Sequence, residues 1–180
     1  MPAKVSAPRA ELKVERELEM MEEKNPEPRV AEQPKPFRLL FEQDVPIPVG
    51  DGLVLRANVF RLDAEGYFPV IMSQGVYGKD LHFEDGFKAQ WDQLISVYPD
   101  LCSSGSTGKY LRWETADAER WVPDGFVIIQ IDSRGSGKSP GYLDPRSPRE
   151  IADYHDAIEW AAHQPWSRAR SGCWAFPITP

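Results

Sequence analysis

The sequence predicts an α/β protein built on a mostly parallel sheet, and three observations point to this class. The segment GFVIIQID, residues 125–132, is apolar and rich in β-branched residues, which is typical of a strand buried on both faces. A loop with several glycines follows it. A helix with a recognisable capping sequence then begins near Ser147. Strand, loop and helix in this order form half of a βαβ unit, and such units build parallel sheets.

Three further strands and a helix are expected before this unit. The segment 44–62 predicts a pair of strands around a turn at Gly50-Asp51-Gly52. The run FPVIMSQG, residues 68–75, is short and apolar and ends at glycine, as buried strands do. Residues 85–97 carry apolar side chains at helical spacing. The α/β class therefore rests on several elements and not on one segment.

The helix after the glycine-containing loop has the clearest local signals. The stretch Ser147-Pro148-Arg149-Glu150 fits a capping box, with a hydroxyl cap, proline at the first helical position and glutamate at the third. Ile151, Tyr154 and Ile158 then recur at helical spacing, and Pro165 ends the helix.

Composition limits the partners of the chain. It has 180 residues and a net charge of −7, which argues against nucleic acid or an anionic membrane as a partner. No apolar run reaches the ~18 residues of a spanning helix, and the N-terminus has no signal-peptide block, so we expect a soluble cytoplasmic protein. Cys102 and Cys173 have neither metal-ligand nor redox spacing and are expected to be free thiols. No spacing of Glu, Asp or His residues predicts a metal site.

The stretch IDSRGSGKSPG, residues 131–141, has the glycines and the Lys-Ser pair of a phosphate-binding loop. A Walker A loop needs glycine five places before the Gly-Lys-Ser triplet, and that place holds Asp132. A dinucleotide fingerprint would need its third glycine where Pro140 stands. We therefore do not expect a nucleotide site here.

The same stretch fits the pattern D-x-R-G-x-G-x-S-x-G and resembles the loop after the fourth strand of α/β-hydrolases. The residues that meet the pattern are Asp132, Arg134, Gly135, Gly137, Ser139 and Gly141. Asp132 is expected to pair with Arg134, and the glycines allow the backbone to turn sharply at the sheet edge. The expected role of this loop is structural and not chemical.

Three more stretches extend the resemblance from about residue 40 to residue 167. They are VPIPVGDGLVLRANVFR, PVIMSQGVYGKD and DYHDAIEWAAHQPWS. Together with DGFVIIQIDSRGSGKSPG they resemble, in the same order, the Xaa-Pro dipeptidyl-peptidase and cocaine-esterase family of serine hydrolases. The resemblance implies the N-terminal part of an α/β-hydrolase sheet, with an opening hairpin followed by parallel strands and flanking helices.

The resemblance also implies a chemistry, which is cleavage of a small ester, peptide or amide substrate through an acyl-enzyme. It places Tyr77 as an oxyanion-hole donor, against the alternative of a packed loop aromatic, while Lys79 and Asp80 shape the turn. His82 is a candidate for the mouth of the pocket. His155 and His163 are expected to serve the helix surface only, and the resemblance implies no cofactor.

The catalytic serine of such an enzyme should lie in a G-x-S-x-G elbow after one more strand. The one G-x-S-x-G in the sequence, residues 137–141, lies in the loop described above, and residues 168–180 contain neither this motif nor an aspartate or histidine. We therefore expect residues 37–167 to form the hydrolase part of a truncated, inactive form. Residues 1–36, which are charged and rich in proline, are expected to be a disordered arm, and residues 168–180 a tail foreign to the family.

The tail has a possible genetic origin. The codons permitted for residues 169–180, read in the frame that joins each last base to the next two, can spell KVGLLGISYYA. This peptide holds a strand and an elbow that lacks only its last glycine. Our hypothesis is that residues after about Ser167 arise from a frameshift or a misassigned splice boundary.

One alternative belongs to another class of protein. The chain could be a short, stable binding or regulatory module that keeps half of the hydrolase fold. Against this, we expect the strand at residues 126–131 to lack its neighbour and to present an open, apolar edge, which would favour aggregation.

Overall fold

The computed structural model describes residues 38–168 and 174–177. The predicted arm over residues 1–36 lies outside the described residues, and so does most of the tail over residues 168–180. The fold reported below is that of the described part of the chain.

The described residues form one mixed sheet in the strand order β1-β2-β4-β3-β5. The strands are β1 (Leu39–Pro48), β2 (Val54–Leu62), β3 (Val70–Gly75), β4 (Val127–Asp132) and β5 (Trp174–Pro177). The β1–β2 hairpin joins β4 in antiparallel orientation, whereas the pairings of β4 with β3 and of β3 with β5 are parallel. The predicted class, with its opening hairpin and parallel strands, is confirmed.

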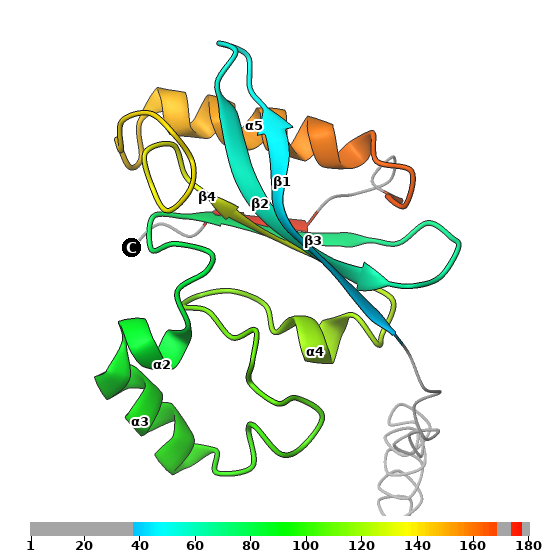
Figure 1. The fold of residues 1–180 in the computed structure, drawn as a ribbon, viewed down its shortest axis with the longest axis vertical. Coiled ribbons are helices and arrows are strands. Elements are labelled where there is room, and N and C mark those ends of the chain that lie inside the picture. Colours follow the sequence, from blue (N-terminus) through cyan, green and yellow to red (C-terminus); the bar gives the residue numbers. More distant parts are fainter. Residues whose placement is uncertain (1–37, 169–173, 178–180) are drawn as a thin grey trace, which may run out of the picture. The chain divides into compact units, whose positions relative to one another are not determined.

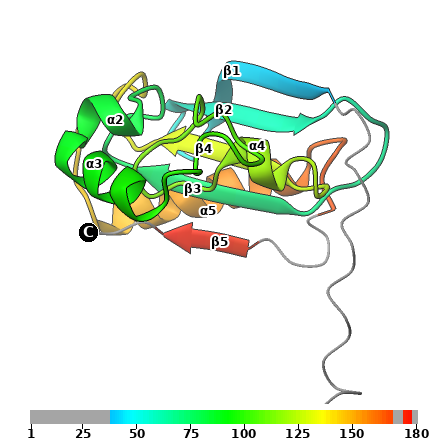
Figure 2. The ribbon, with the colours of Figure 1, turned by 90° about the horizontal axis from the view of Figure 1, so that it is seen from below.

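Helices cover the two faces of this sheet. The described helices are α2 (Phe83–Gly86), α3 (Lys88–Val97), α4 (Ala118–Trp121) and α5 (Pro148–Ala162). Figure 1 shows α5 along one face and α2, α3 and α4 on the other side, and Figure 2 shows the same separation from below. The predicted helix over residues 85–97 is present but is interrupted at Phe87. None of the described helices is long and apolar enough to cross a bilayer.

The core lies mainly between the sheet and α5. Alternate residues of β2, which are Leu55, Ala57 and Val59, pack on this side with the apolar residues of β4 and with Ala157 and Ala161 of α5. All six residues of β4 are buried, as its apolar sequence predicts. Burial of each large aliphatic side chain contributes roughly 1.5–3 kcal/mol, so β4 is a principal source of stability.

The start of α5 follows the predicted capping sequence with one difference. Ser147 Oγ accepts the amide of Glu150 at 3.1 Å, and Pro148 is the first helical residue. In a standard capping box the glutamate returns to the amide of the cap residue. Here the Glu150 carboxylate accepts the Arg146 amide at 2.6 Å and the Ser133 hydroxyl at 2.8 Å. The cap therefore also fastens α5 to the end of β4.

The expected open edge at residues 126–131 is wrong. Strand β4 pairs with β2 on one side and with β3 on the other, so it lies inside the sheet. Strand β5 adds to β3 and not to β4. The error came from assuming that consecutive strands of the chain are neighbours, whereas the crossover places β4 between β2 and β3.

The expected pairing of Asp132 with Arg134 is also wrong. Arg134 instead donates to Asp153 on α5 in a fork, with Nε to Oδ2 at 2.7 Å and Nη2 to Oδ1 at 2.8 Å. It also contacts Asp51 in the β1–β2 turn, with Nη1 3.0 Å from Oδ2. The hydrogen bonds that Arg134 donates to Asp153 and Asp51 raise the pKa of its guanidinium. Arg134 thus joins the hairpin turn, the loop after β4 and α5.

We expect the change Asp153→Ala to lower the free energy of unfolding by about 3 kcal/mol, because it leaves a largely buried arginine without its main partner. The Asp153 side chain is fully buried, whereas that of Asp51 is 40% exposed. The matched change Asp51→Ala should therefore cost much less. Urea unfolding followed by tryptophan fluorescence measures both. Equal losses in the two variants would contradict the central place given to Asp153.

Candidate active site

Two loops meet at the carboxyl edge of the parallel strands. The turn with Tyr77 follows β3, and the loop over residues 133–141 follows β4. Since β3 and β4 are paired in parallel, with Gly75 opposite Asp132, both loops leave the sheet at the same level. In open α/β sheets this edge is where ligands bind.

A small cavity of about 30 Å³, open to solvent, lies beside the Tyr77 turn. Its walls come from the ends of β3 and β4, the Tyr77 turn, Phe87 and the connection before α4. The lining residues are Ser73, Gly75, Tyr77, Gly78, Lys79, Leu81, Phe87, Arg112, Trp113, Thr115, Gln130 and Ile131.

Tyr77 is half-buried in the wall of this cavity. Its ring meets Phe87 edge-on, with ring centroids 5.3 Å apart and planes at 90°. Its hydroxyl makes no hydrogen bond with any residue that the structure describes. The ring is therefore positioned by packing while the hydroxyl is left available to a ligand.

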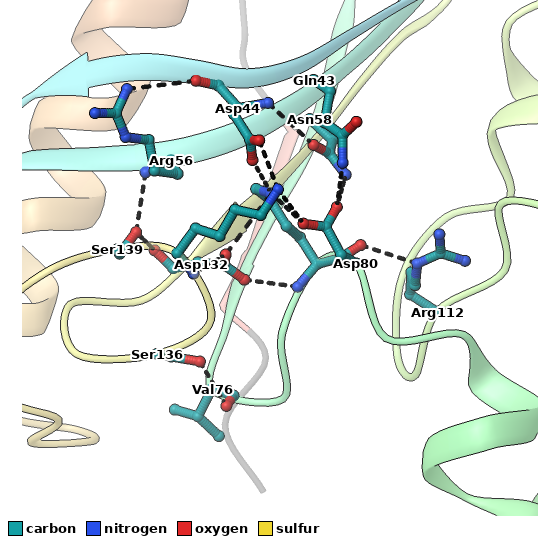
Figure 3. Close-up of polar contacts among 12 residues, drawn as sticks. Gln43, Asp44, Arg56, Asn58, Val76, Asp80, Arg112, Asp132, Ser136 and Ser139 are labelled. Atoms are coloured by element: carbon teal, nitrogen blue, oxygen red, sulfur yellow. Dashed lines mark hydrogen bonds and ion pairs between the residues drawn. The ribbon is translucent and has the colours of Figure 1, made fainter.

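The loop after β4 holds the Tyr77 turn on both sides of the tyrosine. Ser136 Oγ donates to the carbonyl oxygen of Val76 at 2.7 Å. The amide of Lys79 donates to Asp132 Oδ1 at 2.6 Å. Figure 3 shows these contacts, with Asp132 between the two loops. The backbone before and after Tyr77 is thus fixed to β4 and its loop.

Asp132 takes the place that a bound phosphate would occupy in a nucleotide-binding loop. Its second carboxylate oxygen accepts the Lys138 amide at 2.8 Å, and its side chain is only 1% exposed. Burial raises the pKa of the Asp132 carboxyl, although the Lys138 and Lys79 amides act in the opposite direction. Ser139 donates to the Asp132 carbonyl at 2.7 Å and accepts the Arg56 amide at 2.9 Å. The polar groups that resemble a phosphate loop therefore form hydrogen bonds within the protein.

Gly137 is required by this arrangement. Its φ is +50°, and a Cβ built on it would lie 2.3–2.5 Å from the three atoms of the Asp132 carboxylate. Any side chain at this position would displace the carboxylate from the two amides. The glycine pattern of the loop thus makes room for Asp132.

The buried side chain of Lys79 stabilises the Tyr77 turn through ion pairs. The Lys79 side chain is 1% exposed, and its Nζ lies 2.6 Å from Asp44 Oδ1 and 2.9 Å from Asp80 Oδ2. Asp44 has φ +59° in an irregularity of β1, and this geometry brings its carboxylate to the lysine. Lys138 completes the cluster at 2.6 Å from Asp44 Oδ2. We call Asp44, Lys79, Asp80, Asp132 and Lys138 the lysine cluster.

The ion pairs of the lysine cluster shift the pKa values of its more exposed carboxylates, Asp44 and Asp80. Hydrogen bonds from Lys138 and then Lys79 lower the pKa of Asp44. Burial acts to raise the pKa of Asp80, but hydrogen bonds from Lys79 and Asn58 outweigh it and the pKa is strongly lowered. The hydrogen bond to Asp44 raises the pKa of Lys138. These groups are therefore charged at neutral pH and hold the turn electrostatically.

His82, a candidate for the pocket mouth, lies next to the turn but does not line the cavity. Its Nδ1 accepts the Glu84 amide at 3.2 Å as the cap of α2, and its Nε2 lies 2.9 Å from the Gly108 carbonyl oxygen. Both ring nitrogens have a hydrogen-bond partner, so His82 has a structural role in this loop. His155 and His163 lie on α5 and its end, away from the cavity lining.

A family model agrees with this geometry. Residues 51–176 match the model described as X-Pro dipeptidyl-peptidase (S15 family). The chain belongs to the X-Pro dipeptidyl-peptidase (S15) family. The matched range includes the hairpin turn, the Tyr77 turn, the loop after β4, α5 and most of β5.

Individual S15-type relatives support the same assignment. The chain is 25% identical over 131 residues to cocaine esterase of Rhodococcus sp. (strain MB1 Bresler), covering 72% of this chain. A crystal structure of a CocE/NonD family hydrolase from Staphylococcus aureus superposes with a TM-score of 0.59 and 38% identity over 72% of this chain. The fold is that of the α/β-hydrolases.

The chain spans only part of these relatives. It corresponds to 18% of the length of the Rhodococcus esterase and to 21% of the Staphylococcus chain. Tyr77 and the loop after β4 were predictable from the sequence and lie within this S15 segment. The charge partners of Asp44 and Lys138 were not predictable, because they lie far away in the sequence.

The lowered pKa of Asp80 predicts a pH-dependent effect of Asp80→Asn. A carboxylate whose pKa is lowered on folding contributes stability above its unfolded value of about 3.9, and this contribution is lost as the pH falls further. Because Asp80 is partly exposed, we expect a loss of roughly 1 kcal/mol at pH 7 that shrinks toward zero near pH 2.

Chemical unfolding at several pH values measures this effect, with Asp100→Asn as the control at an exposed aspartate whose side chain has no partner among the described residues. The stability of each variant is compared with that of the unaltered chain at the same pH. This removes most of the contribution of Asp132, whose raised pKa adds stability as the pH falls. A loss that is the same at pH 7 and pH 3 would show that the charge of Asp80 is not what matters.

A second prediction concerns Gly137→Ala. The new Cβ would collide with the Asp132 carboxylate, so we expect a loss well above the ~1–2 kcal/mol that a left-handed conformation costs an ordinary residue. The matched variant Gly52→Ala has a similar backbone, φ +85°, but open space around its Cβ. Thermal unfolding of both variants separates the collision from the backbone strain. If the two losses were equal, Asp132 would not depend on this glycine.

Proposed function

We propose that this chain supplies the oxyanion side of a serine hydrolase that cleaves an ester, peptide or amide bond through an acyl-enzyme. In such a reaction a serine attacks the carbonyl carbon, a histidine takes the serine proton, and negative charge develops on the carbonyl oxygen. The proposal gives Tyr77 the role of a hydrogen-bond donor to that oxygen. Family membership supports the reaction class, and Tyr77 supports the role of this segment.

The observation that carries the assignment is the position of Tyr77. It follows β3 at the carboxyl edge, lines the cavity, and has a hydroxyl without a partner among the described residues. A donor is worth about 2.7–4 kcal/mol of transition-state stabilisation when it is held in place before the charge forms. Asp132 and Ser136 provide this preorganisation by holding the backbone on both sides of the tyrosine.

The second part of the proposal is that these 180 residues do not hydrolyse a substrate by themselves. Their one G-x-S-x-G sequence, residues 137–141, places Ser139 in hydrogen bonds with the Asp132 carbonyl and the Arg56 amide. No histidine of the described residues lines the cavity. The proposal further includes a small ester or peptide as the substrate, a cytoplasmic location, and neither nucleic acid nor membrane as a partner. These points rest on the family and on the net charge of −7.

A fluorophosphonate probe tests whether the chain is inactive. Such probes react only with a serine that is activated as a nucleophile. We expect mass spectrometry of the treated, folded chain to find no labelled serine. Labelling of any serine at one equivalent would overturn this part of the proposal.

Sequencing of the transcript across the codons of residues 168–180 tests the frameshift hypothesis. We expect the alternative frame to encode the elbow, and the product of that frame can then be assayed with a p-nitrophenyl ester. In that product Tyr77→Phe should lower kcat by about 10²–10³. Tyr142→Phe, at a side chain 90% exposed, is the matched control and should leave kcat unchanged. Full activity of the Tyr77→Phe product would remove the oxyanion role.

A further inference from the structure

Arg112 is a second functional candidate in the cavity beside Tyr77. Its Nε donates to the Lys79 carbonyl at 2.9 Å, and its Nη1 donates to the carbonyls of Leu111 at 2.8 Å and Lys109 at 3.2 Å. Nη2 has no partner among the described residues, and Arg112 makes no ion pair with any of them. Figure 3 shows its Nε directed at the backbone of the turn. The backbone thus holds the guanidinium in one place without neutralising it.

The cavity lining carries positive charge without a matching negative charge. Among the described residues the lining contains Lys79 and Arg112 but no aspartate or glutamate. Lys79 is already paired with Asp44 and Asp80. Asp80 and Asp85, whose charges act on Arg112, form no ion pair with it, because Asp80 is paired with Lys79 and Lys138 and Asp85 is exposed to solvent. Arg112 is therefore the uncompensated charge of this site, in a chain whose net charge is −7.

Burial makes this uncompensated charge costly. Desolvation lowers the pKa of the Arg112 guanidinium, although distant carboxylates act in the opposite direction. A partly buried guanidinium gains much from a carboxylate, because a hydrogen bond between two charged groups is about twice as strong as one between neutral groups, and Nη2 of Arg112 is free to donate it. An anionic ligand would supply the counter-charge that the described residues do not supply.

An aromatic wall stands next to Arg112. The rings of Phe87 and Trp113 are stacked, with centroids 4.5 Å apart and planes at 21°, and both residues line the cavity. Leu81 adds an aliphatic surface. The floor is neutral and polar, formed by Ser73, Thr115 and Gln130. The cavity therefore offers one cation beside a flat apolar surface.

We propose that this cavity binds a small molecule that carries a carboxylate next to an aromatic or other flat apolar group, with the carboxylate on Arg112. A single uncompensated cation matches a singly charged group. The binding part of the proposal does not need the chain to be an enzyme. The substrate part rests on the proposed function, and it states that the ester or amide to be cleaved carries a free carboxylate on the portion that occupies this cavity.

The test compares ligands that differ in charge but have nearly the same shape. The full 180-residue chain is titrated with phenylacetate, with neutral phenylacetamide and with cationic phenethylamine, and chemical shifts are followed by NMR. We expect phenylacetate to bind at least tenfold more tightly than phenylacetamide, and phenethylamine to bind more weakly still. Equal affinities for phenylacetate and phenylacetamide would overturn the proposal.

Two arginine variants test whether Arg112 causes the preference for phenylacetate over phenylacetamide. Arg112→Gln should reduce the tenfold preference for phenylacetate to about onefold. Arg120→Gln is the matched control, since Arg120 also donates to a backbone carbonyl, that of Leu101 at 3.1 Å, but does not line the cavity. A folded Arg112→Gln chain that keeps the preference would refute the site. If that variant does not fold, Arg112→Lys keeps a charge without the Nη2 donor, and an unchanged preference there would refute the hydrogen bond assigned to Nη2.

The outcome is separable from that of the proposed function. Binding is measured without any hydrolysis, so a chain that prefers phenylacetate supports the site even if no frame of the transcript encodes a serine elbow. An active enzyme whose Arg112→Gln variant cleaves carboxylate-bearing and neutral esters in an unchanged ratio would keep the proposed function and remove the substrate part of this inference.

Discussion

The two hydrogen bonds accepted by the buried carboxylate of Asp132 are the interaction on which the site depends. An ionised carboxylate inside a protein is costly unless donors satisfy it. Here the donors are the amides of Lys79 and Lys138, which lie in different loops. The need to satisfy one charge therefore brings the turn after β3 and the loop after β4 together. Tyr77 is positioned as a consequence.

The glycines of the loop have a related purpose. Successive amides that point inward make a concave site suited to an anion, and phosphate-binding loops use the same principle. In this chain the anion is Asp132, which belongs to the protein. Gly137 leaves space for its carboxylate, and Ser139 fixes its carbonyl. The likeness to a phosphate loop thus reflects shared physics, with an internal ligand in place of an external one.

Two groups of ion pairs stabilise this edge of the sheet. The lysine cluster lies under the Tyr77 turn, whereas Arg134 links the hairpin turn to α5 through Asp51 and Asp153. Each group joins segments that the sheet alone would leave separate. Membership of the S15 family is consistent with this, because the matched range of residues 51–176 begins at Asp51 and contains most of these charges.

The local sequence determined the elements of this protein, and the tertiary structure decided their partners. The strand β4, the cap of α5 and the turn at residues 50–52 were predictable, because apolar runs, capping and turn chemistry act over a few residues. The rejection of a nucleotide site and the place of Tyr77 also followed from the sequence. The crossover that puts β4 inside the sheet did not. Asp44 is 35 residues from Lys79 and 94 from Lys138, and its carboxylate reaches them only through an irregularity in β1. The unpaired charge of Arg112 likewise exists only in the folded chain, where Asp80 is paired with two lysines and Asp85 is exposed to solvent.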